Sequence, residues 1–171
     1  MRCGLLFTAL LSLFLTLQAP VQAGPCSERL VQAAAVGFVP EANAQPFWQV
    51  HGAGFYAYST APDGDLKDAY LALPDLRPGE TLAGLTLYGY REAGTLIGEV
   101  LRVDPEGGKP VASLVIDAGT GYVVRTLTGD TLPALILSDS AYFVRLRVAN
   151  ATQPDQIKAL RVVLTIQPAC Y

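Results

Sequence analysis

The fold class is decided by one stretch of the chain, Ala141–Ala149, which reads AYFVRLRVA. Apolar residues occupy every second position of this stretch, and Arg145 and Arg147 lie between them. Because successive side chains of a β-strand point to opposite faces, this period of two predicts a strand with one buried face. The stretch Leu160–Ile166 alternates in the same way. Both stretches predict strands of an antiparallel, half-buried sheet.

The rest of the chain is divided into short apolar runs by clusters of Gly, Pro, Asp and Asn, which is typical of strands joined by turns. Val31–Val39 combines helical and strand signals, and we interpret it as a strand. Pro40–Gly54 is predicted to be the longest loop. The remaining predicted strands are Phe55–Ser59, Ala69–Leu73, Thr81–Arg91, Leu96–Val103, Val111–Ile116, Tyr122–Leu127 and Leu132–Leu137. Roughly nine or ten such strands predict an all-β fold, an antiparallel β-sandwich of which the jelly roll is one form.

Residues 1–23 have the three parts of a secretory signal peptide. Arg2 supplies the positive start, Leu5–Leu17 is mostly apolar, and Ala23 ends the small-residue cleavage pattern. The apolar run is shorter than the roughly 20 residues that span a bilayer. We therefore expect a cleaved signal peptide and one domain at 24–171, exported to the periplasm, the cell surface or the medium, with no transmembrane segment. An uncleaved anchor is the alternative.

Charge and cysteine content agree with export. All 15 acidic residues lie after position 23, against 11 of the 12 basic ones, which gives the mature chain a net charge of about −4. No run of Lys or Arg is present, so nucleic acid is not an expected partner. Cys26 and Cys170 remain after cleavage, and we expect a disulfide between them. Two free thiols or an intermolecular bridge are the alternatives.

Short motifs follow one another in a set order across about residues 34–167. They are Phe38-Val39-Pro40, Gly54-Phe55-Tyr56, Leu73-Pro74, Gly79-Glu80-Thr81, Leu85–Tyr90, Leu101-Arg102 and Tyr142–Leu146. In this order the chain resembles a loose group of uncharacterised bacterial exported β-sandwich proteins. The resemblance implies the fold and supplies no activity, cofactor or site residue. The chain departs from the pattern in two places: the Leu-Pro to Gly stretch has extra residues at Asp75–Pro78, and the acid often found after the aromatic strand is displaced by Arg91-Glu92.

The residues needed for common catalytic chemistry are sparse. His51 is the only histidine and no Gly-x-Ser-x-Gly motif is present, which disfavours a histidine-based nucleophilic triad. One histidine and two paired cysteines do not make a zinc site, and the acidic run near Asp63 lacks the spacing of an EF-hand loop. We therefore expect no metal and no cofactor. Glu99, inside an apolar strand, is the least ordinary carboxylate, but a glycosidase needs two.

Aromatic residues offer a second kind of site. Trp48, Tyr56 and Tyr58 lie close together in the sequence with His51, and Tyr88 and Tyr90 share one face of a strand. Exposed aromatic rings can stack on sugars or anchor a protein partner, and buried rings would belong to the core instead.

The sequence thus favours a non-catalytic secreted or envelope-associated module with an unknown ligand, a glycan or a protein at the cell surface. Its candidate binding residues are Trp48, His51, Tyr56 and Tyr58. The alternative is a hydrolase that acts on envelope polymers or glycans through acidic residues such as Glu99.

Overall fold

Strands make up nearly all of the regular structure in the computed structural model of this chain. It describes residues 27–42, 44, 48–50, 56–58, 66–73, 75–128, 132, 134–153 and 156–169, with the backbone alone at 49, 50 and 56–58. The single helical element in these ranges is a 3-10 turn, η1 (Ala35–Gly37). Within the same ranges, no helix has the length and apolar character needed to cross a bilayer.

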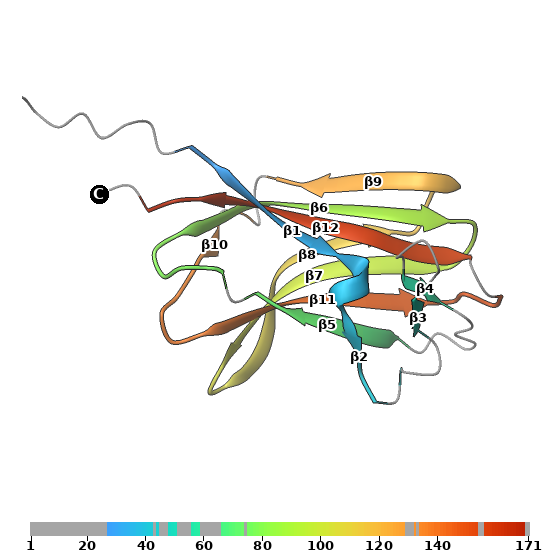
Figure 1. The fold of residues 1–171 in the computed structure, drawn as a ribbon, viewed down its shortest axis with the longest axis horizontal. Coiled ribbons are helices and arrows are strands. Elements are labelled where there is room, and N and C mark those ends of the chain that lie inside the picture. Colours follow the sequence, from blue (N-terminus) through green and yellow to red (C-terminus); the bar gives the residue numbers. More distant parts are fainter. Residues whose placement is uncertain are drawn as a thin grey trace, which may run out of the picture.

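The strands form two antiparallel sheets that lie face to face, as Figure 1 shows. The seven-stranded sheet A contains β1 (Arg29–Ala34), β3 (Trp48–Val50), β4 (Tyr56–Tyr58), β6 (Thr81–Arg91), β9 (Gly121–Leu127), β10 (Ala134–Leu135) and β12 (Ile157–Gln167). The five-stranded sheet B contains β2 (Val39–Pro40), β5 (Lys67–Ala72), β7 (Thr95–Asp104), β8 (Gly107–Ile116) and β11 (Ala141–Ala149). The predicted antiparallel β-sandwich is confirmed.

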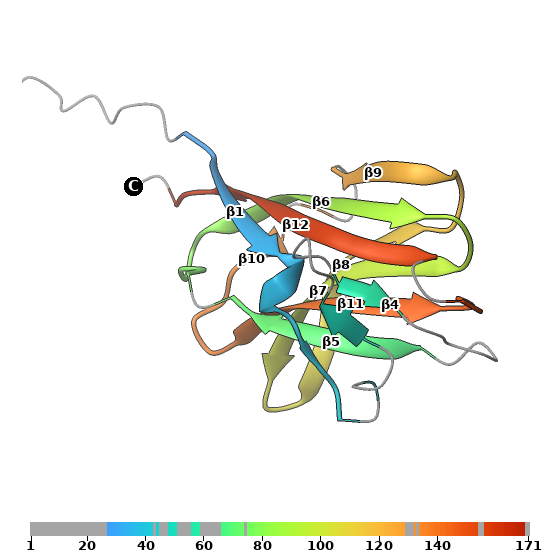
Figure 2. The ribbon, with the colours of Figure 1, turned by 45° about the vertical axis from the view of Figure 1, so that its right-hand side comes forward.

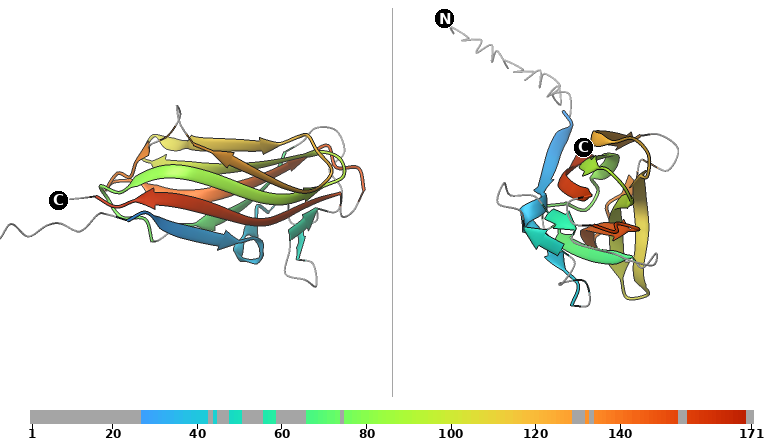
Figure 3. Two further views of the ribbon diagram at one scale, coloured as in Figure 1. Left: turned by 90° about the horizontal axis from the view of Figure 1, so that it is seen from above. Right: turned by 90° about the vertical axis from the view of Figure 1, so that its right-hand side faces the viewer.

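Two long strands, β6 and β12, pair at the centre of sheet A. The outer edge of β6 pairs with β9 and β10, and the outer edge of β12 pairs with β1 and β4. Seen from above in Figure 3, β9, β6, β12 and β1 lie side by side. In Figure 2 the short β3–β4 hairpin lies between β12 and β5. One broad face of sheet A therefore carries side chains from the neighbouring strands β9, β6 and β12.

In sheet B the strand order is β2-β5-β11-β7-β8, so β11 pairs with β5 on one side and with β7 on the other. Arg145 in the middle of β11 is opposite Tyr70 of β5 and Glu99 of β7. Since strand partners directly opposite each other point to the same face, these three residues meet on one side of the sheet.

The inner faces of both sheets meet in one apolar core. Leu85, Leu87 and Leu164 of sheet A are fully buried against Val144 and Leu146 of sheet B, among others. Burying each Leu side chain contributes about 1.5–3 kcal/mol. The alternation that defines Ala141–Ala149 in the sequence thus separates a core face from an outer face, because Phe143, Arg145 and Arg147 point the other way.

Several strand bounds match the prediction and others correct it. Thr81–Arg91 and Ala141–Ala149 are confirmed residue for residue. Val31–Val39 was wrong as one strand, because β1 ends at Ala34 and η1 turns the chain from sheet A toward β2 of sheet B. The described residues form twelve strands, and those beyond the prediction are two- or three-residue pairings that are too short to show a period. Two of them, β2 and β3, include residues of the predicted loop Pro40–Gly54, and β10 keeps only two residues of Leu132–Leu137.

Candidate functional site

The outer face of sheet A gathers tyrosines from two neighbouring strands. Tyr90 of β6 is opposite Tyr122 of β9 and Lys158 of β12, and Tyr88 is opposite Arg161. A Cβ added at Gly89, between the two β6 tyrosines, would meet core side chains, so Tyr88 and Tyr90 point outward. We call Tyr88, Tyr90 and Tyr122, with Lys158 and Arg161, the tyrosine face.

The rings of the tyrosine face touch one another and the two cations. Tyr90 and Tyr122 form an edge-to-face pair with ring centroids 5.4 Å apart. The Nζ of Lys158 lies 5.3 Å from the Tyr90 centroid, and the guanidinium carbon of Arg161 lies 4.0 Å from the Tyr88 centroid. Edge-to-face pairs and cation–π contacts are favourable arrangements of aromatic rings. The contacts therefore order the rings before any ligand arrives.

The tyrosine face remains open to solvent at β9. Tyr122 is 78% exposed, more than any other large apolar or aromatic residue in the described part of the chain. Val124, the next outward residue of β9, is 50% exposed. The Tyr90 hydroxyl donates to the Glu92 carboxylate, and this hydrogen bond raises the pKa of Tyr90 above its ordinary value. Exposed aromatic surface with polar groups at its edge is typical of a binding site.

The outer face of sheet B carries a second cluster, made of charged side chains. Asp68 and Tyr70 come from β5, Glu99 from β7, and Arg145 and Arg147 from β11. We call these five residues the charged lattice. Asp68 and Glu99 are only 6% and 8% exposed. The two carboxylates and two guanidiniums make the lattice neutral overall, as buried charges require.

Hydrogen bonds and ion pairs together connect all members of the charged lattice. Arg145 Nε donates to Glu99 Oε2 at 2.7 Å, its Nη2 forms an ion pair with the same oxygen at 2.6 Å, and its Nη1 lies 3.6 Å from Asp68 Oδ2. Arg147 Nε donates to Asp68 Oδ1 at 2.9 Å, and the Tyr70 hydroxyl donates to Asp68 Oδ2 at 3.2 Å.

The pKa values within the lattice follow from burial and these bonds. Burial opposes the charge on Arg145, but hydrogen bonds to Glu99 and Tyr70 outweigh that effect and raise its pKa. Burial also raises the pKa of Tyr70. At neutral pH, Arg145 is therefore charged and the Tyr70 hydroxyl keeps its proton.

This geometry bears on the hydrolase alternative. Glu99 and Asp68 share one face of sheet B, but each is already held in ion pairs with Arg145 and Arg147. A glycosidase needs one carboxyl group free to protonate the leaving group and a second free to act as nucleophile or base. The arginines occupy both carboxylates, so this pair supplies no such arrangement.

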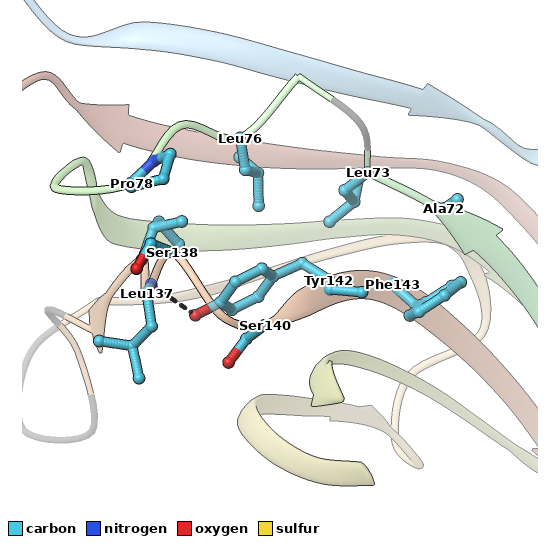
Figure 4. Close-up of a pocket in the computed structure, with 11 residues that line it drawn as sticks. Ala72, Leu73, Leu76, Pro78, Leu137, Ser138, Ser140, Tyr142 and Phe143 are labelled. Atoms are coloured by element: carbon cyan, nitrogen blue, oxygen red, sulfur yellow. Dashed lines mark hydrogen bonds between the residues drawn. The ribbon is translucent and has the colours of Figure 1, made fainter. Parts of the chain in front are cut away.

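A pocket of about 290 Å³ opens at one end of the sandwich, between the β5–β6 connection and the β10–β11 connection (Figure 4). Leu73, Leu76 and Pro78 form one wall, and Leu137 and Tyr142 lie across from them. The Leu137 N–H donates to the Tyr142 hydroxyl at 3.0 Å, which fixes the buried ring. The lining is mostly apolar with two serines, Ser138 and Ser140.

The residues that the sequence singled out as binding candidates divide into two groups. Trp48 is 5% exposed and its indole N–H donates to the Lys67 carbonyl at 3.3 Å, so its ring belongs to the core and leaves no open face for a ligand. Tyr56 and Tyr58 lie in β4, but their side chains are outside the described residues, as are His51, Cys26 and Cys170. Among the described residues, no group of three metal-ligating side chains is present.

Tyr122 was not among the predicted site residues. Its strand, Tyr122–Leu127, was recognised, but nothing local in the sequence places that strand beside Tyr88 and Tyr90. The pairing of β9 with β6 creates the cluster. The outward alternation of Tyr88 and Tyr90 was the one available signal, and it becomes informative once the neighbouring strand is known.

No protein-family model matches this chain, and no curated protein matches it. Among solved structures it is similar to a GH26-CBM35 β-(1,4)-mannanase from Podospora anserina, with a TM-score of 0.50, 13% identity and coverage of 81% of this chain. This chain spans only 28% of the length of the mannanase chain. At this identity the likeness shows the fold alone.

Two further solved structures are similar at lower TM-scores. They are CsCBM6-3 from Clostridium stercorarium in complex with cellobiose (TM-score 0.49, 13% identity, 78% of this chain and 92% of that one) and the low-affinity xylan-binding module CBM86 from Roseburia intestinalis (TM-score 0.48, 10% identity, 82% and 96%).

Proposed function

We propose that this protein is a non-catalytic glycan-binding module that is exported from the cell and binds through the tyrosine face. The observation that carries the proposal is the contact between Tyr90 and Tyr122, with Tyr122 78% exposed. A sugar ring has an apolar C–H face and a rim of hydroxyl groups. An exposed tyrosine offers a ring for that face and a hydroxyl for that rim, which suits a ligand that is apolar on one side and polar at its edge.

The position of the tyrosine face on paired strands supports the proposal. Tyr88 and Tyr90 lie on the central strand β6, and Tyr122 lies on β9 in continuous register with it. A site on rigid strands needs little ordering when it binds, so less of the binding free energy is lost. Glu92, Lys158 and Arg161 place hydrogen-bonding groups around the rings.

The fold is compatible with the same function. It is similar to part of the GH26-CBM35 mannanase chain, and we take the ligand class, a glycan, from that likeness as part of the proposal. A protein partner would use the same exposed rings. Competition distinguishes a glycan site from a site for a protein. Free soluble polysaccharide releases an immobilised polysaccharide from a glycan site, whereas a site for a protein does not hold the polysaccharide at all.

The test of this function is binding of the full chain to a panel of soluble polysaccharides, a xylan, a mannan and a mixed-linkage glucan, by affinity electrophoresis and calorimetry. We expect at least one polymer to bind. Tyr122→Ala and Tyr90→Ala should each weaken that binding by about tenfold, since losing a stacked ring costs roughly 1.4 kcal/mol.

Leu135→Ala is the matched control. Leu135 is 58% exposed and lies on β10 of the same sheet, away from the tyrosines. Its variant should bind as the wild type does. Unchanged affinity of a folded Tyr90/Tyr122 double alanine variant would contradict the assignment of the face, and no binding to any polymer would contradict the function.

A further inference from the structure

The hydrophobic core does not require the charged lattice on the outer face of sheet B. The inner side of the same strands is already apolar and fully buried at Val100, Val144 and Leu146. Burying Asp68 and Glu99 costs desolvation energy, and ion pairs of this kind return little net stability over apolar side chains of similar size. The lattice therefore calls for another explanation.

The two arginines of the lattice differ in how far their donors are used. Nε of Arg145 donates to Glu99, its Nη2 is ion-paired with the same Glu99 oxygen at 2.6 Å, and its Nη1 lies 3.6 Å from Asp68. Arg147 donates to Asp68 through Nε alone, and its Nη1 is 3.8 Å from Glu99, beyond hydrogen-bond distance. Within the described part of the chain, the two terminal amino groups of Arg147 thus have no hydrogen-bond acceptor. Its side chain is 23% exposed, so these groups reach the surface.

An acceptor lies beside these donors. The hydrogen bond and the ion-pair contacts that Glu99 makes within the lattice all involve Oε2, which leaves Oε1 without a donor among the residues that the structure describes. Each hydroxyl of a sugar both donates and accepts. Planar guanidinium and carboxylate groups, fixed by their ion pairs, match two neighbouring hydroxyls without having to reorganise.

The lattice also adjoins the pocket of about 290 Å³. Going along β11 and β5, the outward pairs are Phe143 with Ala72, Arg145 with Tyr70, and Arg147 with Asp68. Phe143 and Ala72 line the pocket, and each pair lies about 7 Å from the next along the strands. One continuous surface therefore leads from an apolar pocket to an array of donors and acceptors.

We infer that the charged lattice and the adjoining pocket form a second glycan site, on the sheet opposite the tyrosine face, which recognises the vicinal hydroxyls of a neutral sugar. This inference rests on the proposed function and deepens it. The equal numbers of positive and negative side chains favour an uncharged ligand over an anion or a cation. Arg145 positions the carboxylate, and Arg147 contacts the ligand.

The experiment uses neutral oligosaccharides, cellohexaose, xylohexaose and mannohexaose, with the full chain carrying ¹⁵N-labelled arginine. The titration is monitored through the arginine Nε–H signals, and the signal of Arg147 should shift as the oligosaccharide is added. The affinity should stay constant from 50 to 500 mM salt, because the ligand is uncharged. Arg147→Lys keeps the charge beside Asp68 but loses the planar donors, so it should weaken binding at this site by about tenfold or more. Arg125→Lys is the matched control, because Arg125 is an exposed arginine on β9 of the other sheet, and it should not change the shift of Arg147 or the affinity of this site.

The outcomes separate this inference from the proposed function. If it is right, the Tyr90/Tyr122 double alanine variant still shifts Arg147 on titration, and Arg147→Lys still binds polymer through the tyrosine face. Polymer binding by the wild type without any shift of Arg147 would overturn the second site alone. A chain that binds none of the polymers or oligosaccharides would overturn both. Because the shift of Arg147 is measured in the wild type, the test does not depend on how well any variant folds.

Discussion

Gly94, in the turn between β6 and β7, is a position at which both the backbone conformation and the packing require glycine. Its φ of +79° lies in the left-handed region, and a Cβ there would be 2.7 Å from Ile157 Cδ1 and 2.8 Å from the Ala149 carbonyl oxygen. The Gly94 carbonyl also accepts a hydrogen bond of 2.7 Å from Arg91 Nε. We expect Gly94→Ala to lower the free energy of unfolding by about 1–2 kcal/mol for the backbone and about 1–3 kcal/mol more for crowding. Urea unfolding at constant m-value measures the loss.

Gly119 provides the control at the same scale. It has a similar φ of +85°, and its carbonyl also accepts a hydrogen bond of 2.7 Å, from Arg91 Nη1. The nearest atom to a Cβ at this position is Val123 Cγ2 at 3.5 Å, an ordinary contact. Gly119→Ala should therefore show the backbone cost alone. Equal losses for the two variants would mean that the crowding at Gly94 is relieved by small shifts.

At the scale of elements, the pairing of β1 with β12 bears on the expected disulfide. The register runs from Ala34 opposite Arg161 to Arg29 opposite Ile166, and Gln167 Nε2 donates to Glu28 Oε1 at 3.2 Å. Cys26 and Cys170 lie just beyond this described pairing in the sequence. Antiparallel neighbours have Cα atoms about 4.5–5.5 Å apart, which is within the reach of a disulfide. We therefore predict a Cys26–Cys170 bridge.

Alkylation followed by intact-mass measurement checks the bridge. The unreduced mature protein should react at no cysteine and the reduced, unfolded protein at two. Reduction should lower stability by up to about 4–5 kcal/mol, since the closed loop spans nearly the whole mature chain. The double Cys26→Ser, Cys170→Ser variant should match the reduced wild type and be insensitive to reductant. Two reactive thiols in the unreduced protein would rule the bridge out.

At the scale of the whole molecule, the two sheets share one core. Leu87 of sheet A packs against Gly98 of sheet B, where an added Cβ would lie 3.1 Å from Leu87 Cδ2. Leu87 and Leu146 are both fully buried, on opposite sheets. We expect Leu87→Ala and Leu146→Ala each to cost about 2–5 kcal/mol. Neither sheet can keep its apolar face covered alone, so both variants should still unfold in one transition.

Two probes test that cooperativity. The fluorescence of Trp48, the single tryptophan and a buried one, reports tertiary packing, and far-ultraviolet circular dichroism reports the sheets. Their unfolding curves should coincide for the wild type and for both variants. Separate transitions for the two probes in either variant would show that the sheets unfold independently.

Several properties follow from the sequence alone. The period of two in Ala141–Ala149 predicted that strand to the residue, because strand alternation is a local property of the chain. The turn residues on either side of Thr81–Arg91 bounded that strand equally well. The same pattern placed Arg145 and Arg147 on the face opposite Val144 and Leu146. The β-sandwich class followed from such strands and the turns between them.

The sites required tertiary structure. Tyr122 meets Tyr90 across 32 positions of sequence, and Arg145 meets Glu99 across 46, because strand pairing brings them together. Trp48 shows the converse, since a prominent aromatic residue in a predicted loop is buried in the core. Alternation determines which residues share a face of one strand, but the order and register of strands depend on long-range packing. That long-range packing assembled both the tyrosine face and the charged lattice.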